Sequence, residues 1–181
     1  MAQWLMRFPL RWLIVSVVLG LIAAAIAVRI SETTCPSDRT GAQRVSLANN
    51  EQVPLGDPPV PYRVHVAVLR DFGLKVLPRL GPQHPLDAFV NVQASTPAEM
   101  EGVSVVCVRV RRGADVWSRR PRTYDTTTSP GQPSAGAWRF AIAQDGPEWE
   151  VGTTVDVEVW LEIRDQRYEL SLGSFTLEKG L

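Results

Sequence analysis

The strongest constraint on the fold is a period-two alternation of apolar and polar residues near the carboxyl end of the chain. Within the segment 155–163, VDVEVWLEI, one face carries Val155, Val157, Val159, Leu161 and Ile163. The other face carries Asp156, Glu158, Trp160 and Glu162. Because successive side chains of a β-strand point to opposite sides, this pattern predicts a strand with one buried face.

The same alternation recurs in the segments 62–70, 87–94, 103–112 and 137–143. In 103–112 it sets one group of side chains, Val106, Val108 and Val110, against another, Cys107, Arg109 and Arg111. In 137–143 it places three large side chains on one side, namely Trp138, Phe140 and Ile142. The four residues RDQR after Ile163 predict a hairpin between 155–163 and 168–179.

Together with weaker strands near 74–77 and 116–124, these segments make about seven or eight strands. Gly and Pro contribute 27 of the 181 residues, 13 and 14 respectively, which favours a turn-rich β protein. Short alternating strands joined by frequent turns predict an all-β, antiparallel, immunoglobulin-like sandwich over residues 62–181.

The amino-terminal part of the chain has a different character. The seventeen residues from Trp12 to Val28 carry no charge. A helix of that length covers roughly 26 Å, the short end of what crosses a bilayer. We therefore expect one transmembrane signal-anchor helix at 12–28, preceded by a short cytoplasmic segment, 1–11. The small residues before Val28 leave an alternative open, in which a signal peptide is cleaved after Ala27.

Small residues recur at every fourth position of this apolar segment, at Ser16, Gly20 and Ala24. A helix with small residues along one face can approach another helix closely. We therefore expect helix–helix pairing in the membrane along this stripe.

Residues 29–61 are polar and rich in proline, which predicts an extracytoplasmic tether between the helix and the sandwich. The two cysteines of the chain, Cys35 and Cys107, both follow the apolar segment. On the exported side of a membrane thiols tend to oxidise, so we expect these two to form a disulfide. Such a bridge would bring the tether across the arginine-bearing face of its strand.

The residues offer little chemistry for catalysis. The two histidines, His65 and His84, are isolated, and no nucleophile or metal-ligand motif accompanies them. The carboxylates Asp156, Glu158 and Glu162 follow from strand alternation, and we expect them to pair across strands with Arg109 and Arg111. The sequence therefore predicts a non-enzymatic protein without a cofactor or metal.

A candidate binding surface lies in the segment 109–122, RVRRGADVWSRRPR. Its members are Trp117 and six arginines: Arg109, Arg111, Arg112, Arg119, Arg120 and Arg122. We add Trp160, because an indole among carboxylates on the polar face of 155–163 would be an exposed anchor for a sugar ring or a protein. Two alternatives remain: the arginines are balanced by nearby carboxylates, or the tether covers Trp160.

The expected function is that of a membrane-anchored binding or scaffold module in the cell envelope, with its N-terminus in the cytoplasm and its carboxyl-terminal domain outside. The expected partners are the bilayer and an envelope protein. The 19 basic and 19 acidic residues cancel, so no global field attracts nucleic acid. The alternative is a secreted or periplasmic carbohydrate-binding module.

Overall fold

The computed structural model describes residues 15, 17–19, 35, 41–70, 85–126 and 136–179 of the chain. These residues belong to two units, Met1–Thr34 and Cys35–Leu181. In the first unit, Val15 and residues 17–19 are helical and exposed. No helix among the described residues has the length and apolar character needed to span a bilayer.

The rest of the expected anchor segment, 12–28, lies outside the described residues. The small-residue stripe at Ser16, Gly20 and Ala24 lies outside them as well.

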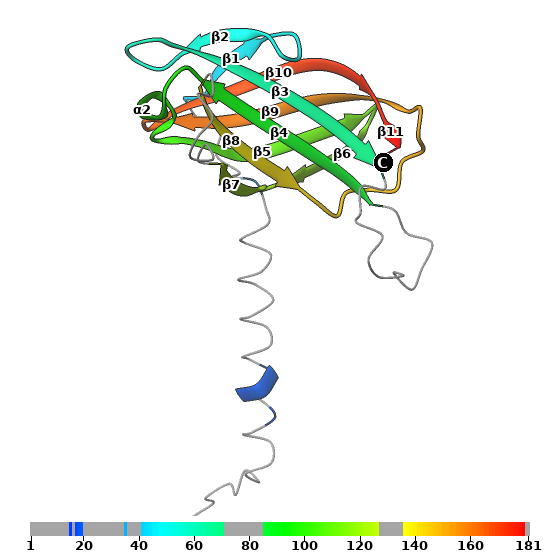
Figure 1. Cartoon of the computed structure of the whole chain (residues 1–181). Coiled ribbons are helices and arrows are strands. Elements are labelled where there is room, and N and C mark those ends of the chain that lie inside the picture. Colours follow the sequence, from blue (N-terminus) through cyan, green and yellow to red (C-terminus); the bar gives the residue numbers. More distant parts are fainter. Residues whose placement is uncertain are drawn as a thin grey trace, which may run out of the picture. The chain divides into compact units, whose positions relative to one another are not determined.

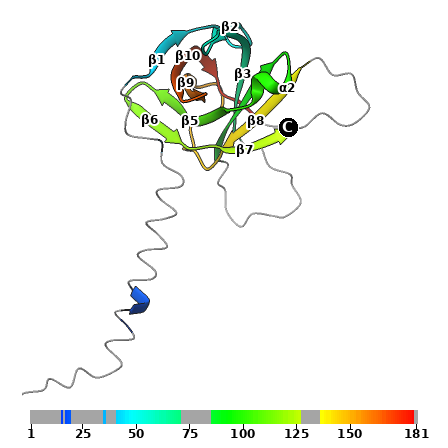
Figure 2. The ribbon, with the colours of Figure 1, turned by 90° about the vertical axis from the view of Figure 1, so that its left-hand side faces the viewer.

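The described residues of the second unit form two β-sheets (Figures 1 and 2). The first sheet contains, in spatial order, β1 (Gln43–Ser46), β10 (Gln166–Thr176), β9 (Thr154–Ile163), β5 (Val103–Arg112) and β6 (Asp115–Arg119). The second contains β11 (Glu178–Lys179), β3 (Val60–Arg70), β4 (Leu86–Ala94), β8 (Ala137–Ala143) and β7 (Arg122–Thr126), with β2 (Gln52–Leu55) beside β3. Neighbouring strands are antiparallel, except that β1 runs parallel to β10 and β11 parallel to β3.

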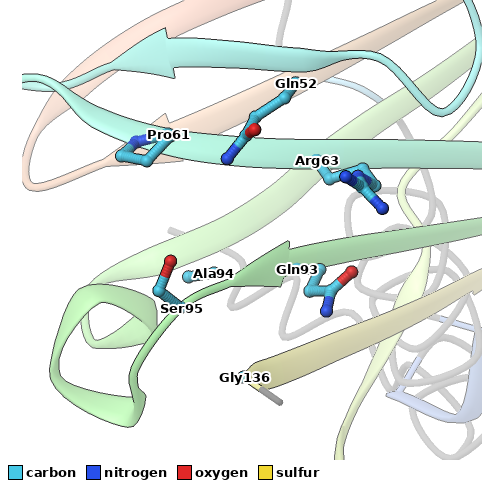
Figure 3. Close-up of a pocket in the computed structure, with 7 residues that line it drawn as sticks. All are labelled: Gln52, Pro61, Arg63, Gln93, Ala94, Ser95 and Gly136. Carbon is cyan, nitrogen blue, oxygen red and sulfur yellow. The ribbon is translucent and has the colours of Figure 1, made fainter.

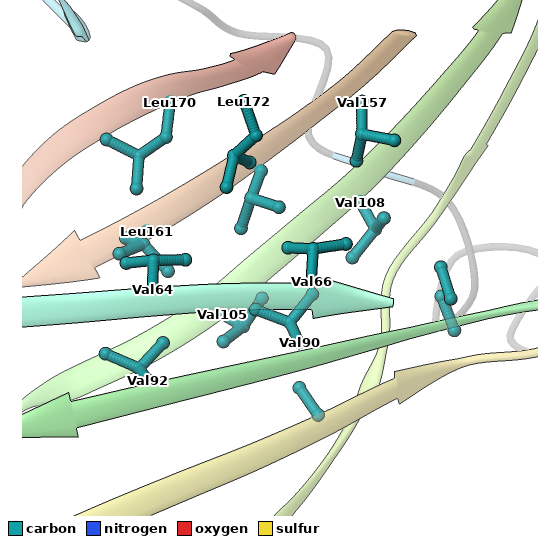
Figure 4. Close-up of a cluster of buried hydrophobic side chains, with 14 of the residues drawn as sticks. Val64, Val66, Val90, Val92, Val105, Val108, Val157, Leu161, Leu170 and Leu172 are labelled. Atoms are coloured by element: carbon teal, nitrogen blue, oxygen red, sulfur yellow. The ribbon is translucent and has the colours of Figure 1, made fainter. Parts of the chain in front are cut away.

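One hydrophobic core joins the two sheets. The second sheet contributes valines from β3 and β4, and the first contributes valines and leucines from β5, β9 and β10, as Figure 4 shows. The apolar face expected for 155–163 is confirmed, because Val155, Val157, Val159, Leu161 and Ile163 are all buried. The arrangement is consistent with an all-β sandwich.

The predicted inner face of β5 is wrong at one residue, because a β-bulge interrupts the alternation. The register against β9 shifts between Val105, opposite Leu161, and Cys107, opposite Trp160. An extra residue in one strand reverses which side chains face the core. Val105 and Val108 therefore belong to the core, while Val106 is only partly buried.

In β8 the large side chains lie on the outer face of the sheet. Three alanines, Ala137, Ala141 and Ala143, face the core and are buried. The residues between them include Trp138, which is exposed, and Phe140, which is partly buried. The aromatic side of this strand therefore lies outside the core.

The sheets begin before residue 62, so the predicted boundary of the tether is wrong. β1 and β2 both lie within the range 29–61, and Val53 and Leu55 of β2 are buried in the core. Proline does not prevent this, because Pro54 lies opposite Pro61 on the edge strand β2, where a missing N–H is tolerated. The hydroxyl of Tyr168 accepts a hydrogen bond of 2.9 Å from the N–H of Gly56 and ties the next turn to β10.

The predicted hairpin between β9 and β10 is confirmed. Its two turn residues, Arg164 and Asp165, have φ of 47° and 70°. Positive φ at both central residues is typical of the turns that match the twist of paired strands. The weaker segment 116–124 contributes to two strands, β6 and β7, which lie in different sheets, and 74–77 lies outside the described residues.

A single helical turn, α2 (Pro97–Met100), follows β4. Thr96 and Glu99 form a capping box, in which each side chain accepts a hydrogen bond from the other residue's backbone N–H. The hydroxyl of Tyr62 donates to the carbonyl of Glu99 at 2.7 Å. Burial raises the pKa of this phenol, and the charge of Arg164 opposes that shift only in part.

Candidate functional site

Trp160 is buried, with 8% of its surface exposed, so the expected exposed indole on this strand is not present. The guanidinium carbon of Arg109 lies 4.9 Å from the centroid of its ring. Arg109 is itself buried, at 7%, and its Nη1 lies 3.0 Å from Oε2 of Glu158. Register explains the cluster, since Cys107 lies opposite Trp160 and Arg109 opposite Glu158. This group stabilises the outer face of the first sheet and offers no free aromatic surface.

The two cysteines lie at disulfide distance, as the sequence predicts. Cys35 and Cys107 are bridged, with Cα atoms 5.2 Å apart and a sequence separation of 72 residues. Cys107 is fully buried on β5, beside Trp160 on β9. The bridge therefore fixes Cys35 to the outer face of the first sheet.

The arginines of the predicted binding surface do not share one face, and those on β5 lie on both sides of the first sheet. Arg111 shares the outer face with Arg109, and its Nη2 lies 3.5 Å from Oε1 of Glu158. Arg112 points to the other side, where its guanidinium lies 2.6 Å from Asp115 and 5.2 Å from the ring centroid of Trp149. The expected pairing of arginine with cross-strand carboxylates is confirmed for Arg109 and Arg111.

The remaining residues of the segment 109–122 also lie on different parts of the fold. Trp117 packs against the core, and Arg119 lies 3.3 Å from Asp145. Arg120 is exposed after β6, whereas Arg122 is exposed on β7 of the second sheet. These residues form no single basic surface.

The outer face of the second sheet carries an aromatic surface that the sequence reading did not identify. We define this aromatic face by Phe89, Tyr124, Trp138, Phe140 and Ile142. Phe89 stacks on Phe140 with ring centroids 5.9 Å apart. Tyr124 lies opposite Phe140, and Trp138 lies two residues further along the same face of β8. Tyr124 and Trp138 are 45% and 38% exposed, so both rings are accessible to a ligand.

The second sheet also has a cleft of about 270 Å³, and Figure 3 shows the residues that line it. We call it the polar cleft; its lining consists of Gln52, Pro61, Arg63, Gln93, Ala94, Ser95 and Gly136. Gln93 connects the two features, because it lies opposite Arg63 on one side and opposite Trp138 on the other. Trp138, Gln93 and Arg63 therefore form one row across three strands.

Gly136 keeps one wall of the polar cleft close to β4. Its φ is +101°, and a Cβ added there would collide with the carbonyl oxygen of Ala94. A side chain is therefore excluded at this position by both the backbone conformation and the available space.

Arg63 differs from the arginines of the first sheet. It is exposed, it lines the polar cleft, and no carboxylate is among the described residues that line the cleft with it. Within the described residues no ion pair of Arg63 is found, whereas Arg109, Arg111, Arg112 and Arg119 all have one. A cation of this kind is a suitable binding group for an anion.

One signal in the sequence could have indicated this face. In AWRFAIA the alanines and the large side chains alternate, so either set can face the core. The polar cleft has no such signal, because its residues come from β2, β3, the end of β4 and the start of β8. No group of three or more metal-ligating side chains occurs among the described residues.

No family model matches the chain, and comparisons with curated proteins and with solved structures find no match either.

Proposed function

We propose that this chain is a membrane-anchored, non-enzymatic binding module of the cell envelope. In this proposal residues 12–28 are a signal-anchor helix, and an immunoglobulin-like sandwich lies outside the cytoplasm. The exposed apolar helical residues Val15 and 17–19 support an anchor, because such side chains are usually covered by protein or lipid. The bridged pair Cys35–Cys107 supports an oxidising compartment.

The observation that carries a binding function is the aromatic face with its adjoining polar cleft. On the outer face of the first sheet the arginines are paired with carboxylates of neighbouring strands, namely Arg109 and Arg111 with Glu158, and Arg44 with Glu169. The outer face of the second sheet instead exposes Tyr124 and Trp138 beside a cleft lined by amides. Exposed aromatic rings next to polar groups are typical of recognition surfaces. We therefore place partner binding on the second sheet.

A photo-reactive phenylalanine analogue at position 138 tests this assignment in native membranes. We expect crosslinked adducts from position 138 and none from position 116. Val116 is the matched control, because it is more exposed than Trp138, at 53% against 38%, but lies on the outer face of the first sheet, opposite Arg111. Adducts of equal yield from both positions, or from neither, would contradict the proposal.

The anchor has a separate test. Mass spectrometry of the mature chain should find the residues up to and including Ala27 retained. The protein should also be recovered in the membrane fraction. A mature terminus at Val28 and a released protein would replace the anchored module by the alternative, a secreted or periplasmic carbohydrate-binding module. The aromatic face is compatible with that alternative, because exposed rings can stack on sugars.

A further inference from the structure

We propose that the polar cleft binds an acidic sugar residue, with Arg63 pairing its carboxylate and Trp138 stacking against its ring. This inference rests on the proposed binding function and names the chemical class of the ligand. It requires one anionic group, several hydroxyl groups and a flat apolar ring face in the same ligand. A uronic acid unit of a polysaccharide combines these three features.

The size of the cleft favours one small unit. Its volume of about 270 Å³ lies just below the usual range for ligand pockets, roughly 300–1,000 Å³. A single sugar ring fits a space of this kind. The cleft lies among exposed residues such as Gln52, Pro61 and Ser95. A polysaccharide with one ring bound in the cleft can therefore continue into solvent on either side of that ring.

The lining has the chemistry that sugar hydroxyl groups require. Gln52 offers an amide that both donates and accepts hydrogen bonds, and Ser95 offers a hydroxyl that does the same. Figure 3 shows Arg63 and Gln93 beside each other on β3 and β4, with Gln52 on the neighbouring strand. Hydrogen bonds between these groups and the hydroxyl groups of a sugar would fix the orientation of its ring.

The charge of the lining selects an anionic ring over a neutral one. Arg63 is the one charged residue among the described residues that line the cleft. Its planar guanidinium can hold a carboxylate through two parallel hydrogen bonds, which are stronger than neutral ones. Since the chain has 19 basic and 19 acidic residues, long-range attraction does not concentrate polyanions on it. Selectivity must therefore come from this local pairing.

Trp138 supplies the apolar contact. Its cross-strand neighbour Gln93 lines the cleft, so the exposed indole lies next to a ring held there. The C–H groups on one face of a sugar ring pack well on an indole, which buries a large area at small entropic cost. Tyr124, exposed on the adjoining strand β7, is placed to contact the following unit of the polysaccharide.

Calorimetric titration of the full-length chain in detergent tests the inference with matched pairs of sugars. The probes are glucuronate, galacturonate and mannuronate, each compared with its neutral counterpart, glucose, galactose or mannose. We expect at least one uronate to bind about tenfold more tightly than its neutral partner, as one charge-assisted pair implies. The indole N–H signal of Trp138 should shift in the same titration.

Two variants assign the effect to residues. Arg63→Gln should abolish the preference for the uronate and leave the weak binding of the neutral sugar unchanged. Arg44→Gln is the matched control, because Arg44 is also exposed but lies on β1 of the first sheet, and it should keep the preference. Trp138→Ala should weaken the binding of acidic and neutral sugars alike.

Three results would overturn the inference: no uronate binds, each uronate binds no better than its neutral partner, or Arg63→Gln and Arg44→Gln reduce the preference equally. Binding of inorganic phosphate as tight as that of the best uronate would also overturn it, because the ring would then contribute nothing. The crosslinking at position 138 is independent of these titrations. Adducts there without uronate binding would leave the binding module standing and remove only the acidic sugar.

Discussion

Arg109 lies over the ring of Trp160, with its guanidinium carbon 4.9 Å from the ring centroid, and both side chains are buried on the outer face of the first sheet. The charge of Arg109 is balanced by Glu158 at 3.0 Å. The cation–π contact and the ion pair share one guanidinium, so loss of the carboxylate leaves a desolvated cation above the indole.

Glu158→Ala should therefore lower the free energy of unfolding by about 2 kcal/mol, because a buried charged donor loses its partner. Glu162→Ala is the matched control on the same strand: its partner Arg167 lies 4.0 Å away and is well exposed, so the loss should stay below about 0.5 kcal/mol. Denaturant unfolding of both variants measures the difference. Equal losses would mean that the Arg109 pair contributes no more than a surface contact.

Period-two alternation was sufficient to locate most strands and the apolar face of β9, because the hydrophobic effect acts on each strand separately. Alternation was not sufficient where the neighbouring strand determines which side chains face the core. The bulge near Cys107 moved Val106 out of the core, and alanines on β8 turned Trp138 outward. These features depend on which strand lies opposite, and that information is absent from a single segment.

The candidate site depends even more on residues that are distant in the sequence. The burial of Trp160 depends on Arg109, which is 51 residues earlier in the chain, and the polar cleft depends on four separated segments. A proline-rich composition also concealed β2, because it predicted a tether over residues 29–61, whereas Pro54 lies on an edge strand, where a missing N–H is tolerated. The cysteine pair was predictable for a different reason: with two cysteines there is one intramolecular pairing.

Breaking the disulfide should destabilise the sandwich. Cys35→Ala opens a loop closed over a sequence separation of 72 residues, which is worth about 4 kcal/mol on the chain-entropy account. We choose Cys35 because Cys107 is fully buried and its replacement would also disturb packing. Reduction of the wild-type chain should cause a similar loss in denaturant midpoint and should leave the variant unchanged. If reduction leaves the wild-type midpoint unchanged, the bridge does not stabilise the fold.

Tyr62 should make the fold sensitive to alkali. Burial raises the pKa of its phenol above the ordinary value of about 10, so the unfolded chain loses this proton at lower pH than the folded chain. The stability contributed by the protonated phenol is complete below about pH 10 and is lost as the pH rises toward the folded pKa. Tyr62→Phe should remove this part of the alkaline decline. Tyr124→Phe, at an exposed position, should leave the alkaline decline in place. Unfolding curves measured from about pH 8 to about pH 11 distinguish the two variants.

Gly136→Ala should destabilise the protein more than Gly152→Ala. Both glycines have positive φ, +101° and +88°, so both variants carry a backbone cost of about 1 kcal/mol. At Gly152 no atom lies within 4 Å of an added Cβ, whereas at Gly136 it meets the backbone of Ala94. The collision should add about 1–3 kcal/mol, because a paired backbone cannot move aside easily. Thermal or denaturant midpoints that fall equally would show that β4 and β8 separate without cost.

Val157→Asp should unfold the second unit. The Val157 side chain is fully buried between the two sheets, opposite Val110 on β5, and no described cation is paired with that position. An unpaired carboxylate there costs several kcal/mol, which is comparable to the whole stability of a domain of about this size. Val151→Asp, in the exposed turn before β9, is the matched control and should change the unfolding free energy by less than about 0.5 kcal/mol. Circular dichroism and the dispersion of amide signals report the outcome. A folded Val157→Asp variant with the midpoint of Val151→Asp would mean that the valine face of β9 does not lie in the core.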